Sequence, residues 1–221
     1  MTVAAPIDRS LVEQIVREVV LAHAGAGAGR SKLVVSVSAR HVHLTDRDVE
    51  TLFGPGRKLT VAKELYQTGF FAAEETLMVV GPRRRMLPTV RILGPTRPES
   101  QVELAFTDGI SLGIDLPVRP SGRLDGSPGC VLVGPAGVVE LTRGVIRAER
   151  HVHMSPSDAA FYGVRDQSRI GLHVISRCET TFHNLLVRVG RGTKLEVHLD
   201  TDEANACDID HATSAELIHE A

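Results

Sequence analysis

The sequence carries one short pattern twice, and this repeat constrains the fold more than any other feature. Residues 40–45 are RHVHLT and are followed by Asp48, while residues 150–155 are RHVHMS and are followed by Asp158. In both copies a strand-like His-Val-His run leads into Thr or Ser with an Asp three residues later, which predicts a capped helix start. The repeat therefore indicates a duplicated unit with pseudo-twofold symmetry.

The chain from Leu33 onward predicts mostly β-structure. Short runs rich in β-branched residues, such as TLMVVGP, CVLVGP and NLLVRVG, end in Gly-Pro or Gly. Closely spaced turn signals of this kind favour β-barrels or a sandwich over a parallel α/β sheet. Two short helices are expected after the two His-Val-His runs, near Asp46–Leu52 and Pro156–Tyr162.

The N-terminal residues have a different pattern. Residues 8–23, DRSLVEQIVREVVLAH, repeat apolar side chains at helical spacing, which predicts an amphipathic helix. Charged residues interrupt this run, unlike the core of a secretory signal, and no stretch approaches the roughly 20 apolar residues of a membrane helix. Residues 24–31, AGAGAGRS, predict a flexible linker. We expect the helix either to dock on another protein or to pack on its own body or a sister subunit.

Charge and cysteine content argue against several classes of protein. Lys plus Arg number 25 and Asp plus Glu 27, so no overall field attracts nucleic acid or an anionic membrane, and neither partner is expected. The three cysteines, Cys130, Cys178 and Cys207, lack CxxC spacing and are odd in number. This argues against a disulfide framework and against a thiolate zinc site, so a reducing cytosol is the expected compartment.

The paired histidines predict a metal site if they lie on strands. Side chains at i and i+2 of a strand point to one face, so His41 and His43 project together, as do His151 and His153. Imidazole nitrogen is a preferred ligand of zinc, and two such pairs brought together by a pseudo-twofold axis would begin a two-metal centre. Hydrogen-bonded core or surface histidines are the alternative, but the matching neighbours of the two pairs favour the metal site.

Longer stretches of the sequence resemble the PduL family of phosphate propanoyltransferases, from about Leu33 to Asn205. The resemblance is carried by SARHVHLT at 38–45, AAEETLMVVGP at 72–82, VRILGPTRPESQVELAFTD at 90–108, LGIDLPVRPSGRLDGSPGCVLVGP at 112–135, AERHVHMSPSDA at 148–159 and LEVHLDTDEANA at 195–206. Three features depart from the family: Ala39 in place of a common Asn, KELYQTGFF at 63–71 in place of a Gln-Pro-Gly turn, and the basic run at 83–85. None of them removes an expected metal ligand.

The resemblance implies a mainly β fold of two pseudo-twofold related β-barrels with short helices, plus the N-terminal amphipathic helix on its flexible linker. The expected divisions are the helix at 1–23, the linker at 24–32, a first barrel from 33–40 and 149–218, and a second barrel from 41–148 with inserted helices. Two zinc ions per chain are implied, in a dinuclear site between the barrels. The implied ligands are His41, His43 and Glu103 for one metal and His151, His153 and His198 for the other.

The resemblance also implies how the substrates bind. Arg97 matches the arginine that the family uses on phosphate, and it is the expected catalytic residue. The residues alone would instead favour a loop arginine paired with Glu99, and for Arg91 an exposed strand residue. Contacts to coenzyme A are implied for Ser38, Lys63, Arg91, Leu93 and Asn205.

The implied activity is that of a phosphate acyltransferase, which interconverts propanoyl-CoA and phosphate with propanoyl phosphate and CoA. Zinc would polarise the thioester, and phosphate held by Arg97 would attack it directly. An acyl-cysteine route is the alternative, although no cysteine lies near an HxH pair in the sequence. Other classes that remain open are a zinc hydrolase or cupin-like metalloenzyme and a non-enzymatic microcompartment component.

Residues 1–23 and their linker resemble the encapsulation peptides of PduL proteins. This resemblance implies that they direct the enzyme into a bacterial microcompartment in the cytoplasm by binding shell or core proteins. There the enzyme would recycle CoA, as in propanediol degradation. A homo-oligomer is expected.

Overall fold

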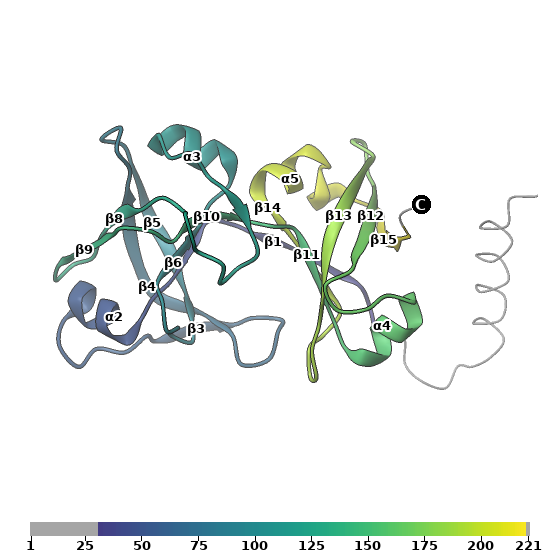
Figure 1. Cartoon of the computed structure of the whole chain (residues 1–221), viewed down its shortest axis with the longest axis horizontal. Helices are drawn as coiled ribbons and strands as arrows, with labels where there is room; N and C mark the ends of the chain where they lie inside the picture. The colour runs from purple at the N-terminus through teal and green to yellow at the C-terminus, as the bar shows by residue number, and fades with distance from the viewer. Residues whose placement is uncertain (1–30, 220–221) are drawn as a thin grey trace, which may run out of the picture. The chain divides into compact units, whose positions relative to one another are not determined.

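Strands dominate residues 31–219, the part of the chain that the computed structural model describes, which confirms the mainly β fold (Figure 1). The helix expected within residues 1–23 and nearly all of its linker lie outside the described residues. Within residues 31–219, no helix combines the length and the apolar character needed to cross a bilayer. In chain order the elements are β1 (Val34–Ser38), β2 (His41–His43), α2 (Asp46–Phe53), β3 (Val61–Glu64), β4 (Phe71–Val80), β5 (Met86–Gly94), β6 (Gln101–Glu103), α3 (Phe106–Leu112), β7 (Val118–Arg119), β8 (Cys130–Val133), β9 (Val138–Leu141), β10 (Val145–Ala148), β11 (His151–Met154), α4 (Pro156–Tyr162), β12 (Arg169–Ile175), β13 (Thr180–Val189), β14 (Glu196–Asp200), α5 (Thr201–Ala206), the 3₁₀ helix η1 (Ile209–His211) and β15 (Ser214–Ile218).

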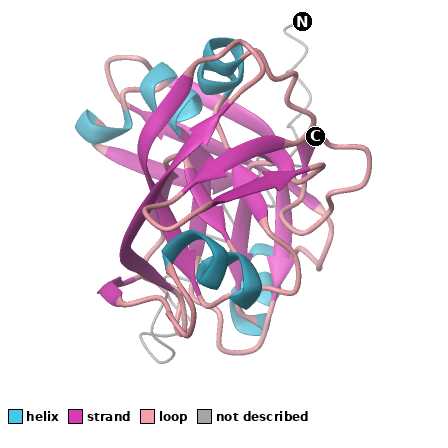
Figure 2. Ribbon diagram, turned by 90° about the vertical axis from the view of Figure 1, so that its left-hand side faces the viewer, coloured by secondary structure: helices cyan, strands magenta, loops and turns pink. Residues whose placement is uncertain are grey.

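The strands form two curled sheets, each around its own apolar core (Figure 2). The six-stranded sheet has the order β1-β14-β11-β13-β12-β15, and the nine-stranded sheet has the order β7-β10-β6-β2-β5-β4-β8-β9 with β3 paired to β4. Val42 and Val152 are fully buried, one in each core. Because each valine lies between the two histidines of its pair, both histidines of that pair point to the opposite face of the sheet.

The two sheets repeat one pairing pattern around the His-Val-His strands. β2 runs antiparallel to β6 and parallel to β5, and β11 runs antiparallel to β14 and parallel to β13. A short helix follows each strand, as expected, and the hydroxyls of Thr45 and Ser155 accept the N–H groups of Asp48 and Asp158 at the two helix starts. The sequence repeat is thus a structural repeat with a pseudo-twofold relation.

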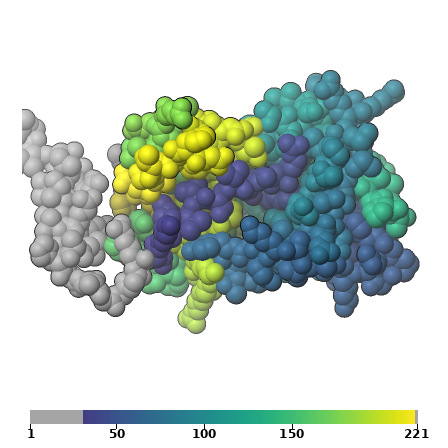
Figure 3. Space-filling view, turned by 180° about the vertical axis from the view of Figure 1, so that it is seen from behind, coloured from purple at the N-terminus to yellow at the C-terminus, as the bar shows by residue number. Residues whose placement is uncertain are grey.

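The chain crosses from one sheet to the other immediately before each histidine pair. β1 belongs to the six-stranded sheet, where it lies beside β14, but β2 belongs to the nine-stranded sheet. β10 and β11 make the reverse crossing. In Figure 3 the purple segment that contains β1 runs along the yellow C-terminal part of the body and continues toward the blue part. The two histidine pairs therefore begin where the two sheets exchange strands.

Two helices, α3 and α5, are additional to the two short helices expected after the His-Val-His runs. Helix α3 follows β6 and helix α5 follows β14. In the first turn of α3 the Asp108 carboxylate accepts the backbone N–H of the cap residue Ala105, and in the first turn of α5 the Glu203 carboxylate accepts that of the cap residue Asp200. The spacing from Asp200 to Glu203 is a capping-box signal, so α5 could have been predicted. α3 offers less, because Ala105 provides no capping oxygen and Gly109 lowers helix propensity.

Candidate metal centre

Two groups of three potential metal ligands occupy matching strands. The ligand atoms within each group lie within 4.8 Å of one another. In both groups the third member faces the first across the antiparallel strand pair, because Glu103 is the partner of His41 and His198 is the partner of His151. The structure therefore brings together all six side chains that the family resemblance implies as ligands, namely His41, His43 and Glu103 in one group and His151, His153 and His198 in the other.

The first group presents two imidazole nitrogens to one carboxylate. His41 Nε2 lies 3.5 Å from Glu103 Oε2, and His43 Nε2 lies 3.9 Å from Glu103 Oε1. The Nδ1 atoms donate to backbone carbonyls, that of His41 to Ala39 at 2.8 Å and that of His43 to Leu93 at 3.2 Å. Each Nε2 is thereby left with its lone pair directed at the carboxylate, which is the tautomer that binds a metal.

The second group consists of three imidazoles. The rings of His151 and His198 stack with their centroids 4.8 Å apart, and His153 meets both edge-on. His151 Nδ1 donates to the carbonyl of Glu149 at 2.8 Å, so its Nε2 is also available. Among the described residues, His198 Nε2 is a buried nitrogen without a hydrogen-bond partner. Because buried polar atoms are normally satisfied, this orphaned nitrogen fits a bound metal.

Burial and neighbouring groups hold three of the imidazoles and the Glu103 carboxylate in the protonation states that bind metal. Burial lowers the pKa of His43 and of His151 to about 3 and that of His153 to about 4. For Glu103 burial acts in the opposite direction, but the neighbouring imidazoles and the Ser121 hydroxyl outweigh it and lower the pKa to about 2. Near neutral pH these three imidazoles are therefore uncharged and the carboxylate is ionised. This nitrogen-rich donor set fits zinc.

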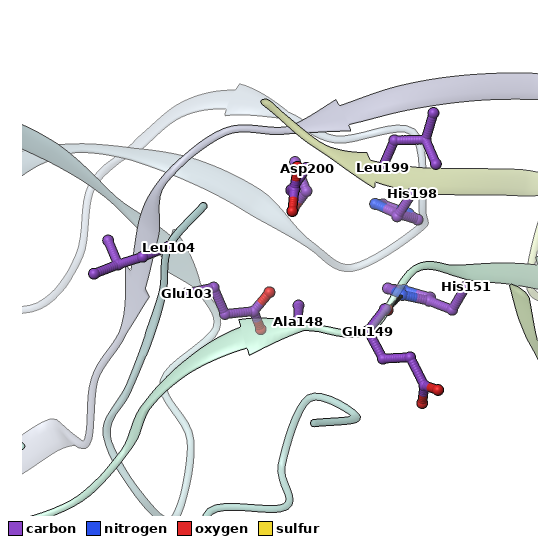
Figure 4. A pocket seen from close by; sticks show the side chains of 9 residues that line it. Glu103, Leu104, Ala148, Glu149, His151, His198, Leu199 and Asp200 are labelled. Carbon is purple, nitrogen blue, oxygen red and sulfur yellow. Dashed lines mark hydrogen bonds between the residues drawn. The ribbon is translucent and has the colours of Figure 1, made fainter. Parts of the chain in front are cut away.

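One narrow cleft is lined by both groups. Glu103 from the first group and His151 and His198 from the second contribute to its wall, together with Ser38. In Figure 4 the Glu103 carboxylate points toward the side of the cleft where the two imidazoles lie. The fold thus brings one member of the first group and two members of the second to a shared cleft, as a two-metal centre requires.

The residue two positions before Glu103 supports this carboxylate. Gln101 lies on the same face of β6, and its Nε2 donates to Glu103 Oε1 and to Ser121 Oγ, the latter at 2.9 Å. Ser121 Oγ in turn donates to Glu103 Oε1 at 2.8 Å. Sequence reasoning missed both residues, although the period of two along β6 places Gln101 beside Glu103.

The equivalent residue of the other sheet is acidic. Glu196 lies two positions before His198, and its Oε2 is 3.2 Å from His198 Nε2, outside hydrogen-bond geometry. Ser36 donates to this carboxylate at 2.5 Å and Gln67 at 2.8 Å. Gln67 comes from segment 63–71, where the sequence departs from the family pattern. The acidic third ligand of the first group, Glu103, thus has the amide of Gln101 beside it. The third ligand of the second group, His198, has the carboxylate of Glu196 beside it.

Arg97 lies next to the first group. Its backbone N–H donates to the Leu44 carbonyl at 2.8 Å. Its guanidinium donates at 3.1 Å to Ser121 Oγ, the hydroxyl that also contacts Glu103. Glu99 instead pairs with Arg143 at 2.6 Å, so the alternative of an Arg97–Glu99 pair is wrong. Burial lowers the pKa of Arg97.

The residues implied for coenzyme A are spread over both sheets. Ser38 lines the cleft at the end of β1, and α5, which carries the exposed Asn205, packs against β1. Lys63 and Leu93 are both partners of one β4 residue, Ala72, so they flank it on β3 and β5. The Arg91 side chain is directed to backbone, because its Nη1 donates to the carbonyls of residues 73 and 74 at 2.8 and 3.2 Å.

A buried ion-pair network joins the two sheets next to the cleft. Arg147 on β10 donates to Asp200 at the end of β14, and it also contacts Glu203 on α5 at 2.7 Å. Arg150, directly before His151, contacts Glu203 at 2.7 Å. Sequence reasoning missed this network, because its partners are far apart in the chain.

The sequence of this chain is similar to those of several proteins of known family. Residues 34–210 match the family described as phosphate propanoyltransferase. The phosphate propanoyltransferase of Planctopirus limnophila is 57% identical over 228 aligned residues, which cover 98% of this chain and 93% of the relative. That of Thermotoga maritima is 50% identical over 79% of this chain and 83% of the relative, and that of Lachnoclostridium phytofermentans is 47% identical over 92% and 96%. These matches confirm the resemblance found in the sequence motifs, and the chain belongs to the phosphate propanoyltransferase family.

Proposed function

We propose that this chain is a zinc-dependent phosphate propanoyltransferase that interconverts propanoyl-CoA and phosphate with propanoyl phosphate and CoA. The observation that carries the proposal is the pair of three-residue ligand groups on symmetry-related strands, with members of both groups lining one cleft. The activity for which the similar proteins are named supports the reaction class. The buried His198 Nε2, which makes no hydrogen bond to the described residues, supports metal dependence.

Two zinc ions per chain would be held by the two ligand groups defined above. When bound, zinc supplies a Lewis acid that polarises the thioester carbonyl. The chain keeps the donors in the required state, because burial holds His43, His151 and His153 neutral. Gln101 and Ser121 fix the orientation of the Glu103 carboxylate by donating to it.

Arg97 would hold the phosphate for direct attack. Its planar guanidinium matches phosphate oxygens, and Ser121 orients it beside the first ligand group. A phosphate oxygen then forms the new bond to the acyl carbon, the carbon–sulfur bond breaks, and the thiolate of CoA leaves with the electron pair. Positioning lowers the barrier to this step, and a thiolate leaves without a strong general acid.

The cysteines support direct transfer over an acyl-cysteine route. Cys130 and Cys207 are buried, and burial raises the pKa of the Cys130 thiol to about 12. Cys178 is exposed in the turn between β12 and β13. Among the described residues that line the cleft, none is a cysteine. CoA itself would be held through Ser38, Lys63, Arg91, Leu93 and Asn205.

Free-thiol release from propanoyl-CoA tests the proposal, measured with and without phosphate and before and after treatment with a chelator. We expect release that requires phosphate, stops on chelation and returns with zinc, while acetyl-CoA and longer thioesters measure the acyl preference. Thioester loss without phosphate would identify a hydrolase instead. Bound zinc with no acyl transfer would leave a metal-binding microcompartment component as the better explanation.

We further propose that residues 1–23 direct the enzyme into a bacterial microcompartment in the cytoplasm by binding its shell or core proteins. The support is the amphipathic pattern of these residues and the linker that follows them. The enzyme would there recycle CoA, as in propanediol degradation, and it would be a homo-oligomer. A fluorescent protein fused to residues 1–23 should collect in the compartments of cells that make the shell, and diffuse fluorescence would refute targeting. Sizing of the full and truncated chains tests self-association.

A further inference from the structure

A second cavity opens beside the metal-ligand groups. Its volume is about 400 Å³, and its lining includes Ser121 and Arg123 from the nine-stranded half and Glu149, Arg169 and Arg188 from the other half. Ser121 contacts both Glu103 and Arg97, and the carbonyl of residue 149 accepts from His151 Nδ1. The cavity is therefore connected to both ligand groups through residues of its own lining.

The charge of this cavity is positive. Of its three arginines, Arg169 is neutralised by Glu149 at 2.5 Å. Within residues 31–219, neither Arg123 nor Arg188 takes part in an ion pair. Arg188 is also half-buried, so it has lost part of its hydration without gaining a carboxylate. A half-buried guanidinium in this state favours the binding of an anion.

Arg188 lies beside the second ligand group. On β13 it is the direct partner of His153 in the parallel pair with β11, so the two side chains lie on one face of the sheet. Arg97 reaches the same cavity wall through its hydrogen bond to Ser121. Arg188 lies on a strand of the six-stranded sheet and Arg97 in the β5–β6 loop of the other half, and each lies next to one of the two ligand groups.

Electrostatics support this placement. The pKa of Arg97 is lowered by burial and further by the charge of Arg188, while Glu103 opposes both effects. Two guanidinium groups that repel each other are thus held near the ligand groups by the fold, and an anion between them would remove the repulsion.

We propose that Arg188 and Arg97 form a two-arginine clamp for the phosphoryl oxygens of inorganic phosphate, with the 400 Å³ cavity as the route by which this anion reaches the cleft. The inference rests on the proposed function and assigns Arg188 a substrate-binding role in it. The same groups would hold the phosphoryl end of the acyl phosphate in the reverse direction. The phosphates of CoA are a poorer fit, because they lie at the end of that molecule remote from its thioester.

The experiment compares the wild type with Arg188→Gln, Arg188→Lys and the control Arg191→Gln. Arg191 is an exposed arginine in the turn after β13, three positions beyond Arg188. Thiol release is measured as a function of phosphate and, separately, of propanoyl-CoA. A lost charged contact predicts a KM for phosphate about tenfold or more higher in Arg188→Gln, an intermediate value in Arg188→Lys, and KM values for propanoyl-CoA within about threefold of wild type. The Arg191→Gln variant should match the wild type in both.

Binding is measured independently of turnover by the rise in melting temperature that inorganic phosphate causes. We expect this rise in the wild type and in Arg191→Gln, and its loss in Arg188→Gln at unchanged zinc content. If Arg188→Gln does not fold, the phosphate dependence of Arg188→Lys decides. A KM for phosphate within twofold of wild type in the Arg188 variants would overturn the clamp, as would a rise in KM confined to CoA substrates. If the wild type releases no thiol in response to phosphate, the proposed function fails, while a phosphate-induced stabilisation that depends on Arg188 would still support the anion site.

Discussion

Replacing Arg147 with methionine should destabilise the zinc-free protein by about 3–5 kcal/mol, because it removes the cation from a buried network. The side chains of Arg147, Asp200 and Glu203 are 11%, 7% and 6% exposed. After the substitution Glu203 keeps its contact to Arg150, whereas Asp200 keeps the backbone N–H of Glu203 as its hydrogen-bond donor. Asp200 is therefore the uncompensated charge. For a protein of this size the melting temperature should fall by roughly 6–20 °C.

The matched control is Arg143→Met, four positions earlier in the chain. Arg143 also contacts two carboxylates, those of Glu99 and Asp125, but its side chain is 50% exposed and the partners are 46% and 99% exposed. Water already solvates these charges, so a loss of about 0–1 kcal/mol is expected. Urea unfolding at pH 7.5 measures both variants.

Two outcomes would refute the reasoning about Arg147. One is a free energy of unfolding for Arg147→Met within about 1 kcal/mol of that for Arg143→Met. The other is failure of the double variant Arg147→Met with Asp200→Asn to recover stability. The second substitution removes the uncompensated charge while retaining a capping oxygen. This variant should recover about half or more of the lost stability if the buried carboxylate is the cause.

Three further predictions concern the ligand groups and the cysteines. His151→Ala should lose both zinc and turnover, whereas Arg97→Ala should keep zinc and lose turnover by about a hundredfold; metal analysis and thiol release measure both, and retained activity in either would contradict the assignment. The contribution of His43 to the stability of the zinc-free protein should be constant above about pH 6.5 and should be lost as the pH falls toward 3, because in that range His43 binds a proton in the unfolded chain but not in the folded one. The loss for this residue is roughly 3 kcal/mol at pH 4. A urea midpoint that does not change between about pH 7 and pH 4.5 would contradict this prediction. Cys178→Ala should leave turnover within about twofold, and a loss greater than tenfold would favour the acyl-cysteine route.

The elements that sequence predicted well are those whose signals are local. The histidine period of two and the capping oxygens of Thr45 and Ser155 identify β2, β11 and the helices after them, because each signal lies within a few residues. Glu103 and His198 carry no local signal of this kind, since each is a single ligand on a strand. They entered as candidates through the family resemblance, and strand pairing is what brings them opposite His41 and His151.

Charge pairing at the site was the least predictable feature. The partners of Arg147 and Arg150 depend on which strand ends and loops meet, and composition gives no information about this. Glu99 shows the consequence: it is close to Arg97 in sequence, yet it pairs with Arg143 because the β5–β6 loop directs the two side chains to different neighbours. Sequence proximity predicted the wrong ion pair because a loop does not have the fixed side-chain period of a strand.

The strand crossings explain why one cleft can collect ligands from both halves of a duplicated chain. The carbonyls of Ala39 and Glu149, which fix the tautomers of His41 and His151, lie in the two short links between sheets. Each link is held at both ends, because β1 pairs with β14 while β2 pairs with β6, and β10 pairs with β6 while β11 pairs with β14. Neither sheet can form its complete set of strand pairs without the strand that leads into the histidine pair of the other. The two ligand groups are therefore oriented by the same pairings that join the halves, and the geometry of the site forms together with the fold.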